Sequence, residues 1–255
     1  MYLELKNLHK RFDKEPVVDD LNLSLDKGEL LCILGGSGCG KTTTLNMIGG
    51  FLPPDAGTIH LDGMEITHLP PERRPVATVF QSYGLFPHMT VLQNVIYGLK
   101  FKGYKKADAK KKGYEYLELV GLQDYANKRI HEISGGQQQR TALARALIVE
   151  PKLCLLDEPL SNLDAALRVK MRSELKTIQR ELGITMVFVT HDQEEALLLS
   201  DKMAIMEQGK LVQFGAPEEI FRNPATPFVQ EFLSLSNLRW EEDGTLVKII
   251  KSGEA

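Results

Sequence analysis

The stretch GGSGCGKTTT, residues 35–44, limits the fold of this chain more than any other stretch. It follows the apolar run ELLCILG and precedes a run with helical periodicity. Glycines at this density disfavour both a strand and a helix opening, and backbone propensity therefore does not account for them. Residues 35–42 match G-x-x-x-x-G-K-[ST] between a strand and a helix, a pattern that predicts a phosphate-binding loop.

Each part of this loop has a chemical role in the prediction. Its backbone N–H groups point into one concavity, and the following helix adds its positive N-terminal end. Lys41 reaches the terminal phosphates of a nucleotide, and Thr42 offers a hydroxyl to Mg²⁺. A glycine turn that contains a lysine by chance is the alternative. The predicted nucleotide contacts are Gly35, Gly36, Ser37, Gly38, Cys39, Gly40, Lys41, Thr42 and Thr43.

A pair of carboxylates lies in a second apolar run, LCLLDEP at residues 153–159. Asp157 follows four residues of a predicted buried strand, a position from which it can reach the metal through Thr42 or a water. Two carboxylates beside a polyphosphate repel each other unless a cation or a shared proton offsets them. We therefore expect Asp157 to bind Mg²⁺ and Glu158 to polarise the attacking water, with a solvated DEP turn as the alternative.

Short apolar runs bounded by breakers predict strands that are buried on both faces, and such strands form parallel sheets with helices between them. The runs cover residues 31–36, 153–159 and 185–192. The expected helices cover residues 42–49, 165–182 and 193–200. The fold class is therefore α/β.

Other parts of the chain have different patterns. The N-terminal region alternates apolar and polar residues up to a Lys27-Gly28 turn, which predicts an antiparallel β region. Residues 88–150 have few strand-like runs and several helical ones, which predicts a helical insertion into the α/β core. Near the end, a hairpin that turns at Gln208-Gly209 leads to a short helix in PEEIFRNP.

Composition excludes several classes of protein. The formal net charge of −3 gives no global attraction to nucleic acid or to an anionic membrane surface. The most basic run, KGYKKADAKKK at 102–112, is interpreted as a solvated helix face, with lipid or nucleic-acid contact as the alternative. Three cysteines without metal-ligand spacing indicate a reducing compartment. No uncharged apolar run of roughly 18 residues is present, so work at a membrane would need a partner.

The run ISGGQQQR, residues 133–140, carries a motif of one family among phosphate-loop proteins. With it, the chain resembles the nucleotide-binding subunit of ATP-binding cassette (ABC) transporters from about residue 3 to about residue 235. The resemblance implies a P-loop NTPase (RecA-like) core with an N-terminal antiparallel β subdomain and an inserted α-helical subdomain. It further implies an ATPase domain over residues 1–235, with the insertion at about 88–150, and a short tail over 236–255.

The resemblance assigns roles to residues outside the phosphate loop. Phe12 stands where the family has an aromatic side chain that stacks on adenine, with core packing as the alternative. Gln81 matches the glutamine loop, which contacts the metal and the water, although such a residue can also cap a strand. His191 matches the switch histidine that contacts the γ-phosphate, although a lone histidine at a strand end is often only a satisfied polar residue.

Two further motifs imply a dimer. The family signature grips phosphate through residues that match Ser134, Gly135, Gly136 and Gln137. One chain cannot easily bring this turn and the phosphate loop onto one γ-phosphate, whereas two chains arranged head to tail can. Asp164 ends the SNLD stretch, which resembles the loop that crosses the dimer interface, and Ser161 or Asn162 could also cap a helix there.

The implied function is that of an importer ATPase that uses ATP and Mg²⁺. Its partners would be a second copy of itself and integral-membrane permease subunits, with an extracytoplasmic solute-binding protein acting indirectly and no nucleic acid. The permease would dock beside the glutamine loop, where Tyr83, Leu85, Phe86 and Met89 form an apolar cluster that could also be ordinary packing. The chain would lie at the cytoplasmic face of the plasma membrane as a peripheral subunit.

The wording of the motifs is most similar to polyamine, iron(III), sulfate, sugar and phosphonate importers, and we favour polyamine, iron(III) or a related small polar solute. Gly36 and Ile133 replace a proline and a leucine that are common in these relatives. The chain also ends where such relatives continue into a β-rich regulatory domain, so regulation through that domain is not expected. The alternatives are a soluble ABC ATPase that acts on nucleic acid or ribosomes, and a P-loop kinase.

Overall fold

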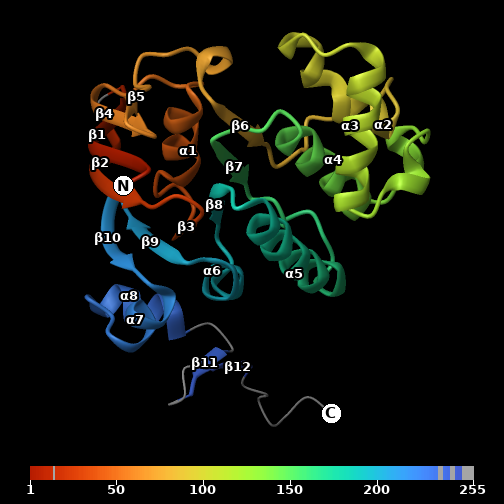
Figure 1. Cartoon of the computed structure of the whole chain (residues 1–255). Coiled ribbons are helices and arrows are strands. Elements are labelled where there is room, and N and C mark those ends of the chain that lie inside the picture. Colours follow the sequence, from red (N-terminus) through yellow and green to blue (C-terminus); the bar gives the residue numbers. More distant parts are fainter. Residues whose placement is uncertain (14, 235–237, 242–244, 249–255) are drawn as a thin grey trace.

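A six-stranded sheet forms the centre of the computed structural model, which describes residues 1–13, 15–234, 238–241 and 245–248. Its strand order is β10-β9-β3-β8-β7-β6 (Figure 1). All neighbours are parallel except the pair β9 and β10. The strands are β3 (Leu30–Gly35), β6 (Val76–Val79), β7 (Leu153–Asp157), β8 (Thr185–Thr190), β9 (Lys202–Glu207) and β10 (Lys210–Gly215).

The central strands are apolar along their whole length because both faces of the sheet are covered. Every residue of β3 and β8 is buried. In β3, Leu30, Cys32 and Leu34 face one core, whereas Leu31 and Ile33 face the other. This period-two division confirms the prediction of doubly buried parallel strands.

A second sheet, antiparallel, carries the N-terminus, as its alternating pattern predicts. Its order is β2-β1-β4-β5, and Leu3 pairs with Leu25 and Leu61. The strands are β1 (Leu3–Phe12), β2 (Glu15–Leu25), β4 (Ala56–Leu61) and β5 (Met64–Glu65). The turn between β4 and β5 uses Asp62 and Gly63, both at positive φ.

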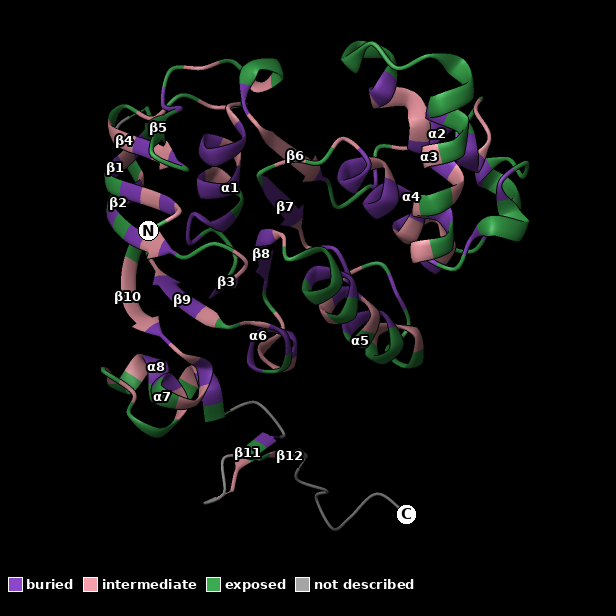
Figure 2. Ribbon diagram, viewed as in Figure 1, coloured by how far each residue is buried: buried purple, intermediate pink, exposed green. Residues whose placement is uncertain are grey.

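Helices cover both faces of the central sheet (Figure 2). Helix α1 (Lys41–Gly49) lies in the same core as the antiparallel sheet, and α4, α5 and α6 pack on the opposite face. The remaining α-helices are α2 (Val91–Ile96), α3 (Lys106–Leu119), α4 (Gly135–Leu147), α5 (Ala165–Leu182), α6 (Gln193–Leu199), α7 (Pro217–Arg222) and α8 (Pro227–Ser234). The 3₁₀ segments in the described part of the chain are η1 (Pro71–Arg73), η2 (Tyr97–Lys102), η3 (Gln123–Tyr125) and η4 (Ile130–Glu132). Within the described residues, no helix combines the length and apolarity needed to cross a membrane.

The segment between β6 and β7 contains helices and no named strand, in agreement with the expected helical insertion. Figure 1 shows α2, α3 and α4 gathered at one side of the central sheet. The basic run within it lies largely on the exposed face of α3, but Lys112 is an exception because it pairs with Glu150. Its contact with Glu150 raises the pKa of Lys112 despite partial burial.

The hairpin of β9 and β10 turns at Gln208 and Gly209, at φ 47° and 82°, as predicted. Helix α7 follows it, as PEEIFRNP predicts, and α8 was not anticipated. Beyond α8 a short antiparallel pair joins β11 (Leu238–Trp240) to β12 (Leu246–Lys248). The domain boundary at residue 235 stays a prediction, because residues 235–237, 242–244 and 249–255 lie outside the described residues.

Candidate active site

The glycine-rich loop connects the carboxyl end of β3 to α1, as its pattern predicts. Gly40, the residue before α1, has φ 101°, and a Cβ atom there would lie 2.4 Å from the carbonyl oxygen of Val17. Only glycine meets both conditions. Added Cβ atoms at Gly36 and Gly38 would meet no atom within 4 Å, so this side of the loop faces open space that a phosphate chain could enter.

Lys41 is nearly buried, with 7% of its surface exposed. Its Nζ donates hydrogen bonds to the carbonyl oxygens of Gly35 and Gly36, at 2.8 and 2.9 Å. The ammonium group therefore lies inside the curve of the loop, where an anionic ligand would meet it. Cys39 is also buried, and burial raises the pKa of its thiol, which lowers its reactivity.

Thr42 and Asp157 meet at the start of α1, although they are far apart in the sequence. The Thr42 hydroxyl donates to Oδ1 of Asp157 at 3.2 Å. Burial raises the pKa of Asp157, and the neighbouring charge of Glu158 adds to this effect. Mg²⁺ prefers oxygen ligands, and the Thr42 hydroxyl and the partly buried Asp157 carboxylate together offer such ligands.

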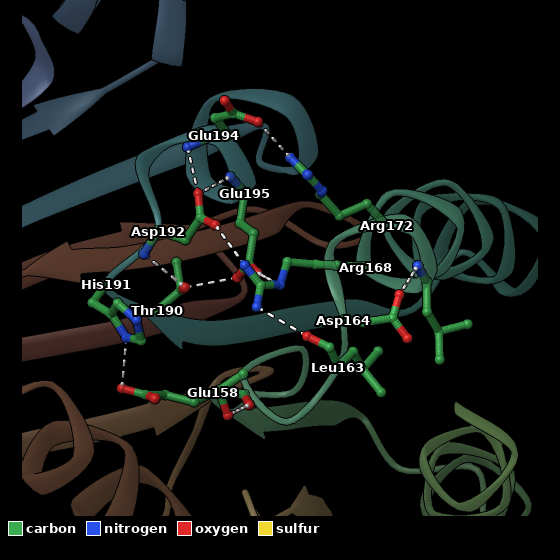
Figure 3. A network of polar contacts seen from close by, with 12 residues as sticks. Glu158, Leu163, Asp164, Arg168, Arg172, Thr190, His191, Asp192, Glu194 and Glu195 are labelled. Carbon is green, nitrogen blue, oxygen red and sulfur yellow. Dashed lines mark hydrogen bonds and ion pairs between the residues drawn. The ribbon is translucent and has the colours of Figure 1, made fainter. Parts of the chain in front are cut away.

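The Glu158 carboxylate contacts two other side chains, one through each oxygen. Oε1 of Glu158 lies 3.3 Å from Nδ1 of His191 (Figure 3), and Oε2 accepts a hydrogen bond from Nε2 of Gln81 at 3.3 Å. The three residues follow β7, β8 and β6, which are neighbours in the sheet. Carboxyl ends of parallel strands meet at one edge, so this edge collects the predicted hydrolytic residues beside the glycine-rich loop.

The segment after Glu158 fixes this arrangement. The Ser161 hydroxyl donates to the Glu158 carbonyl oxygen at 2.9 Å, and Asn162 donates to the Gln81 carbonyl oxygen at 2.8 Å. The idea that Ser161 or Asn162 caps the next helix is wrong. Asp164 is the N-cap of α5, since its carboxylate accepts from the backbone N–H of Leu167 at 2.9 Å. Ser161 and Asn162 instead bond the backbone of Glu158 and Gln81.

The predicted signature residues open helix α4, at a distance from the glycine-rich loop in the fold (Figure 1). Ser134 and Gln137 form a reciprocal capping box, in which Gln137 Oε1 accepts from the Ser134 N–H at 2.9 Å. A Cβ atom at Gly136 would lie 2.9 Å from a methyl group of Leu167. The turn therefore packs against the start of α5, close to Asp164.

Phe12 ends β1 with 48% of its surface exposed, so the core-packing alternative does not hold. The ammonium group of Lys10 lies 5.9 Å from the centroid of its ring. Phe12 and Val17 belong to one hairpin, and Val17 closely approaches Gly40 of the glycine-rich loop. The half-exposed ring is thus on a hairpin that touches the loop.

The apolar cluster after Gln81 is less exposed than its sequence suggests. Tyr83 is buried in the core, which supports the packing alternative for this residue. Met89 instead lines an open cavity of about 580 Å³ on the helical region, bounded by α2, η2 and the start of α3. The other lining residues are His88, Gln93, Ile96, Tyr97, Lys100, Tyr104, Lys106 and Ala109.

Comparison with known families decides the assignment. The ABC transporter family model matches residues 18–161, which include the glycine-rich loop, the signature turn and both carboxylates. The chain belongs to the ABC transporter family. Its two sheets and helical region are those of an ABC ATPase, so the chain carries the ATPase domain of this family.

Curated members of the ABC family are similar over most of this chain. The spermidine/putrescine import ATP-binding protein PotA of Marinobacter nauticus is 52% identical over 92% of this chain and 63% of its own length. The Fe(3+) ions import ATP-binding protein FbpC of Agrobacterium fabrum is 48% identical over 91% of this chain and 66% of its own length. The chain therefore spans less than two thirds of the length of the Marinobacter relative.

Solved ABC structures share the fold. The ATP-binding cassette MJ0796, in a dimeric post-hydrolysis state bound to ADP and Pi, has a TM-score of 0.74 and 32% identity, with 84% of this chain and 98% of that chain covered. CbiO1 from Clostridium perfringens, part of the ABC transporter complex CbiONQ, has a TM-score of 0.80 and 30% identity, with 88% and 92% covered.

Sequence reasoning missed residues that support the ABC motifs without belonging to the usual set. Ser161 and Asn162 were considered as part of the interface loop or as helix caps, whereas their side chains bond Gln81 and the backbone of Glu158. Arg168 was not considered at all, although it bonds the carbonyl oxygen of Leu163. No local pattern marks such contacts, because they depend on how α5 lies against neighbouring segments.

Proposed function

We propose that this chain is the ATP-binding and hydrolysing subunit of an ABC importer. The observation that carries the proposal is the position of Glu158, whose carboxylate is held by His191 and Gln81 beside a phosphate loop. The curated relatives named as import ATP-binding proteins support the import direction. The soluble alternative that acts on nucleic acid or ribosomes has no such support.

The residues present fit ATP and Mg²⁺. The loop from Gly35 to Thr43 would hold the phosphates. Lys41 would replace its hydrogen bonds to the loop carbonyl oxygens with hydrogen bonds to phosphate oxygens. Thr42, Asp157 and Gln81 would hold Mg²⁺, since their oxygen atoms gather at the carboxyl ends of neighbouring strands. When bound, this ion supplies charge neutralisation to the terminal phosphates.

Three side chains divide the hydrolytic work. Glu158 accepts the proton of a water that attacks the γ-phosphorus, while the bond to the ADP oxygen breaks. The Gln81 amide orients the Glu158 carboxylate through Nε2 and offers its oxygen to the metal. His191, whose ring is 63% exposed, contacts the γ-phosphate and keeps the carboxylate of Glu158 directed toward the water. Phe12 stacks on the adenine ring.

The signature turn completes the site in a second copy. Ser134, Gly135, Gly136 and Gln137 grip the γ-phosphate bound by the loop of the other chain, in a head-to-tail homodimer. The solved cassette MJ0796 is dimeric with ADP and Pi, which supports this arrangement. Leu163 and Leu167, on either side of Asp164, lie against the signature turn, so Asp164 would face the partner copy.

The cavity beside Met89 receives a permease subunit. It lies on the helical region that follows Gln81, so a shift of Gln81 on hydrolysis can reach it through the intervening segment. The chain works as a peripheral subunit at the cytoplasmic face of the membrane, with a solute-binding protein acting on the other side. The solute is a polyamine, iron(III) or a related small polar solute, as the names of the relatives suggest.

Uptake measurements test this function. Cells that lack the gene are complemented with the wild type, with Glu158→Gln, or with Glu115→Gln, an exposed carboxylate of α3 that serves as the matched control. We expect uptake of radiolabelled spermidine, putrescine or iron(III) to return with the wild type and the control but not with Glu158→Gln. Normal uptake of all three solutes without the gene would contradict the proposed solutes, and purified protein without ATPase activity would contradict the enzyme.

A further inference from the structure

The backbone on each side of His191 is fixed by hydrogen bonds of its neighbours. The buried hydroxyl of Thr190 donates to Oε2 of Glu195 at 2.7 Å and accepts from the backbone N–H of Asp192 at 3.0 Å. The side chain of His191 contacts Glu158, and its ring is largely exposed. The backbone position from which this ring extends is therefore set by the residues before and after it.

Asp192 continues this set of contacts into α6. Its Oδ1 accepts from the backbone N–H groups of Glu194 and Glu195, at 2.8 and 3.1 Å, and so caps the helix. Its second oxygen, Oδ2, lies 3.6 Å from Nη1 of Arg168 (Figure 3). Asp192 thus joins the end of β8 to an arginine of a different helix.

Arg168 of α5 contacts three groups with three different nitrogen atoms (Figure 3). Nη1 faces Asp192, Nε lies 3.9 Å from Oε1 of Glu195, and Nη2 donates to the carbonyl oxygen of Leu163 at 3.0 Å. A planar guanidinium can bridge groups in this way, whereas an ammonium group acts as a point charge. The Arg168 side chain therefore connects Asp192 and Glu195, which hold the end of β8, to the segment before α5.

That segment also holds the other hydrolytic residues. Ser161 bonds the carbonyl oxygen of Glu158, and Asn162 bonds that of Gln81. Leu163 lies directly after them, so its carbonyl oxygen marks the end of the segment that positions Glu158 and Gln81. Arg168 therefore joins this segment to the end of β8 through contacts separate from the one between Glu158 and His191.

The charges in this network make a fixed geometry favourable. Glu195 is only 3% exposed, and burial raises its pKa, although the hydroxyl of Thr190 and the two arginines act in the opposite direction. Asp192, on the same element, adds negative charge, while Arg168 and Arg172 face Glu195 from α5. A buried carboxylate is costly without a cation, so displacement of Arg168 would leave Glu195, the acceptor of the Thr190 hydroxyl, with only Arg172 to offset its charge.

We propose that Arg168 is a positioning residue for ATP hydrolysis, which links the segment holding Glu158 and Gln81 to the strand end that carries His191. The inference rests on the proposed function, because it requires that these three residues act on ATP. Arg168 touches neither nucleotide nor water in this role. It sets the distance between the His191 ring and the Glu158 carboxylate through Leu163 on one side and Asp192, Glu195 and Thr190 on the other.

Arg172 offers a matched comparison. It lies one turn further along α5 and pairs with α6 through Glu194, Nη1 to Oε2 at 3.5 Å, and its side chain is the more deeply buried of the two, 9% exposed against 30% for Arg168. No hydrogen bond of Arg172 to the segment 158–164 or to residues 190–192 is found within the described residues. If Arg168 only joined α5 to α6, loss of either arginine would have the same effect.

The test compares purified Arg168→Gln and Arg172→Gln. ATPase rates are expressed per site that binds a fluorescent ATP analogue, so that misfolded protein does not count. For Arg168→Gln we expect kcat to fall about tenfold or more with KM for ATP changed less than about twofold, because misplacement of reacting groups affects the chemical step. For Arg172→Gln we expect kcat within about twofold of the wild type, even if its melting temperature falls.

A spectroscopic readout separates positioning from stability. The ring ¹H–¹³C signal of His191, assigned by its loss in His191→Ala, should shift in Arg168→Gln and stay in place in Arg172→Gln. Thr190→Val, which removes the central hydroxyl with little change of volume, should shift the same signal and lower kcat, and it provides a second variant if Arg168→Gln does not fold. Arg168→Lys should recover less than half of the wild-type kcat, because a single ammonium group cannot bridge three acceptors.

Each outcome has a definite meaning. Equal losses of kcat in the two glutamine variants, an unmoved His191 signal in Arg168→Gln, or full activity in Arg168→Lys would overturn the positioning role. A wild-type protein that binds ATP but does not hydrolyse it would contradict the proposed function instead. A coupled loss, in which Arg168→Gln and Thr190→Val together cost no more than either alone, would support the inference.

Discussion

The Glu158 carboxylate and the His191 imidazole lie 3.3 Å apart, Oε1 to Nδ1, although the two residues are 33 positions apart in the chain. The register of β7 and β8 explains this, since Asp157 is paired with Val189 and the backbone N–H of Glu158 donates to the carbonyl oxygen of Val189 at 3.1 Å. Glu158 adopts φ 44°, which is strained for a residue with a side chain. The chain thus leaves the strand conformation directly after β7, at the residue whose carboxylate contacts His191.

Glu158→Gln should abolish turnover while keeping nucleotide. The amide cannot accept the proton of the attacking water, so we expect kcat to fall about 100-fold or more. Phosphate binding does not depend on this side chain, and the ATP-bound dimer should persist. Phosphate release and size-exclusion chromatography with light scattering check the two parts. A variant that stays monomeric with ATP and Mg²⁺ would count against the dimer.

Thr42→Ala should raise the Mg²⁺ concentration needed for half-maximal ATPase activity about tenfold or more, because it removes a hydroxyl ligand beside Asp157. Titration of ATPase activity with Mg²⁺ measures this value. Thr44→Val is the control, since the Thr44 hydroxyl donates to the carbonyl oxygen of Gly40 inside α1 and faces no ligand. An unchanged Mg²⁺ requirement in Thr42→Ala would remove Thr42 from the metal site.

Gly40→Ala should destabilise the fold, and Gly36→Ala should not. At Gly40 the backbone has φ 101°, and an added Cβ would lie 2.4 Å from the carbonyl oxygen of Val17. Such combined strain should lower the free energy of unfolding by about 2–4 kcal/mol. At Gly36 an added Cβ meets nothing within 4 Å. Urea unfolding of both variants gives the two free energies of unfolding. Equal stabilities would mean that the loop conformation differs from the one described.

Glu195→Gln should change how stability depends on pH. Because burial raises the folded-state pKa of Glu195 above its ordinary value of 4.5, ionisation costs folding free energy as pH rises from 4.5 through the raised value. The wild type should therefore lose stability relative to Glu195→Gln over that window, and the difference should be constant at higher pH. Urea midpoints between pH 4 and pH 8, taken in steps of about half a unit, measure it. The opposite slope would indicate that the arginines dominate.

Local patterns were sufficient to predict the elements that hold the nucleotide motifs. The apolar run at 31–36 and the helical pattern at 165–182 predicted β3 and α5 to within one residue of their observed ends. The phosphate loop, Asp157 and Glu158 were predicted because phosphate and metal chemistry restricts residue types at fixed spacing. The pair β4 and β5 had a readable signal as well, an Asp62-Gly63 turn between alternating residues, which was overlooked.

Contacts between distant segments could not be predicted in the same way. That Asp164, rather than Ser161 or Asn162, caps α5 depends on the tertiary bonds that the other two side chains make with Gln81 and Glu158. Arg168 contacts Asp192 and Glu195, which lie more than 20 positions further along the chain, and no spacing in the sequence encodes these contacts. Burial of Tyr83 is another result of packing that composition alone did not indicate.

Complementation between two inactive variants tests the central claim, a site shared between two copies, most directly. Lys41→Ala removes the phosphate contact of one loop, and Ser134→Arg blocks the signature turn. Each variant alone should be inactive, but a mixture contains dimers with one intact loop facing one intact turn. We predict that ATPase activity returns to about a quarter of the wild-type rate on mixing, as random pairing of two chains implies. A mixture that stays inactive, although Ser134→Arg binds ATP and dimers form, would contradict the shared site.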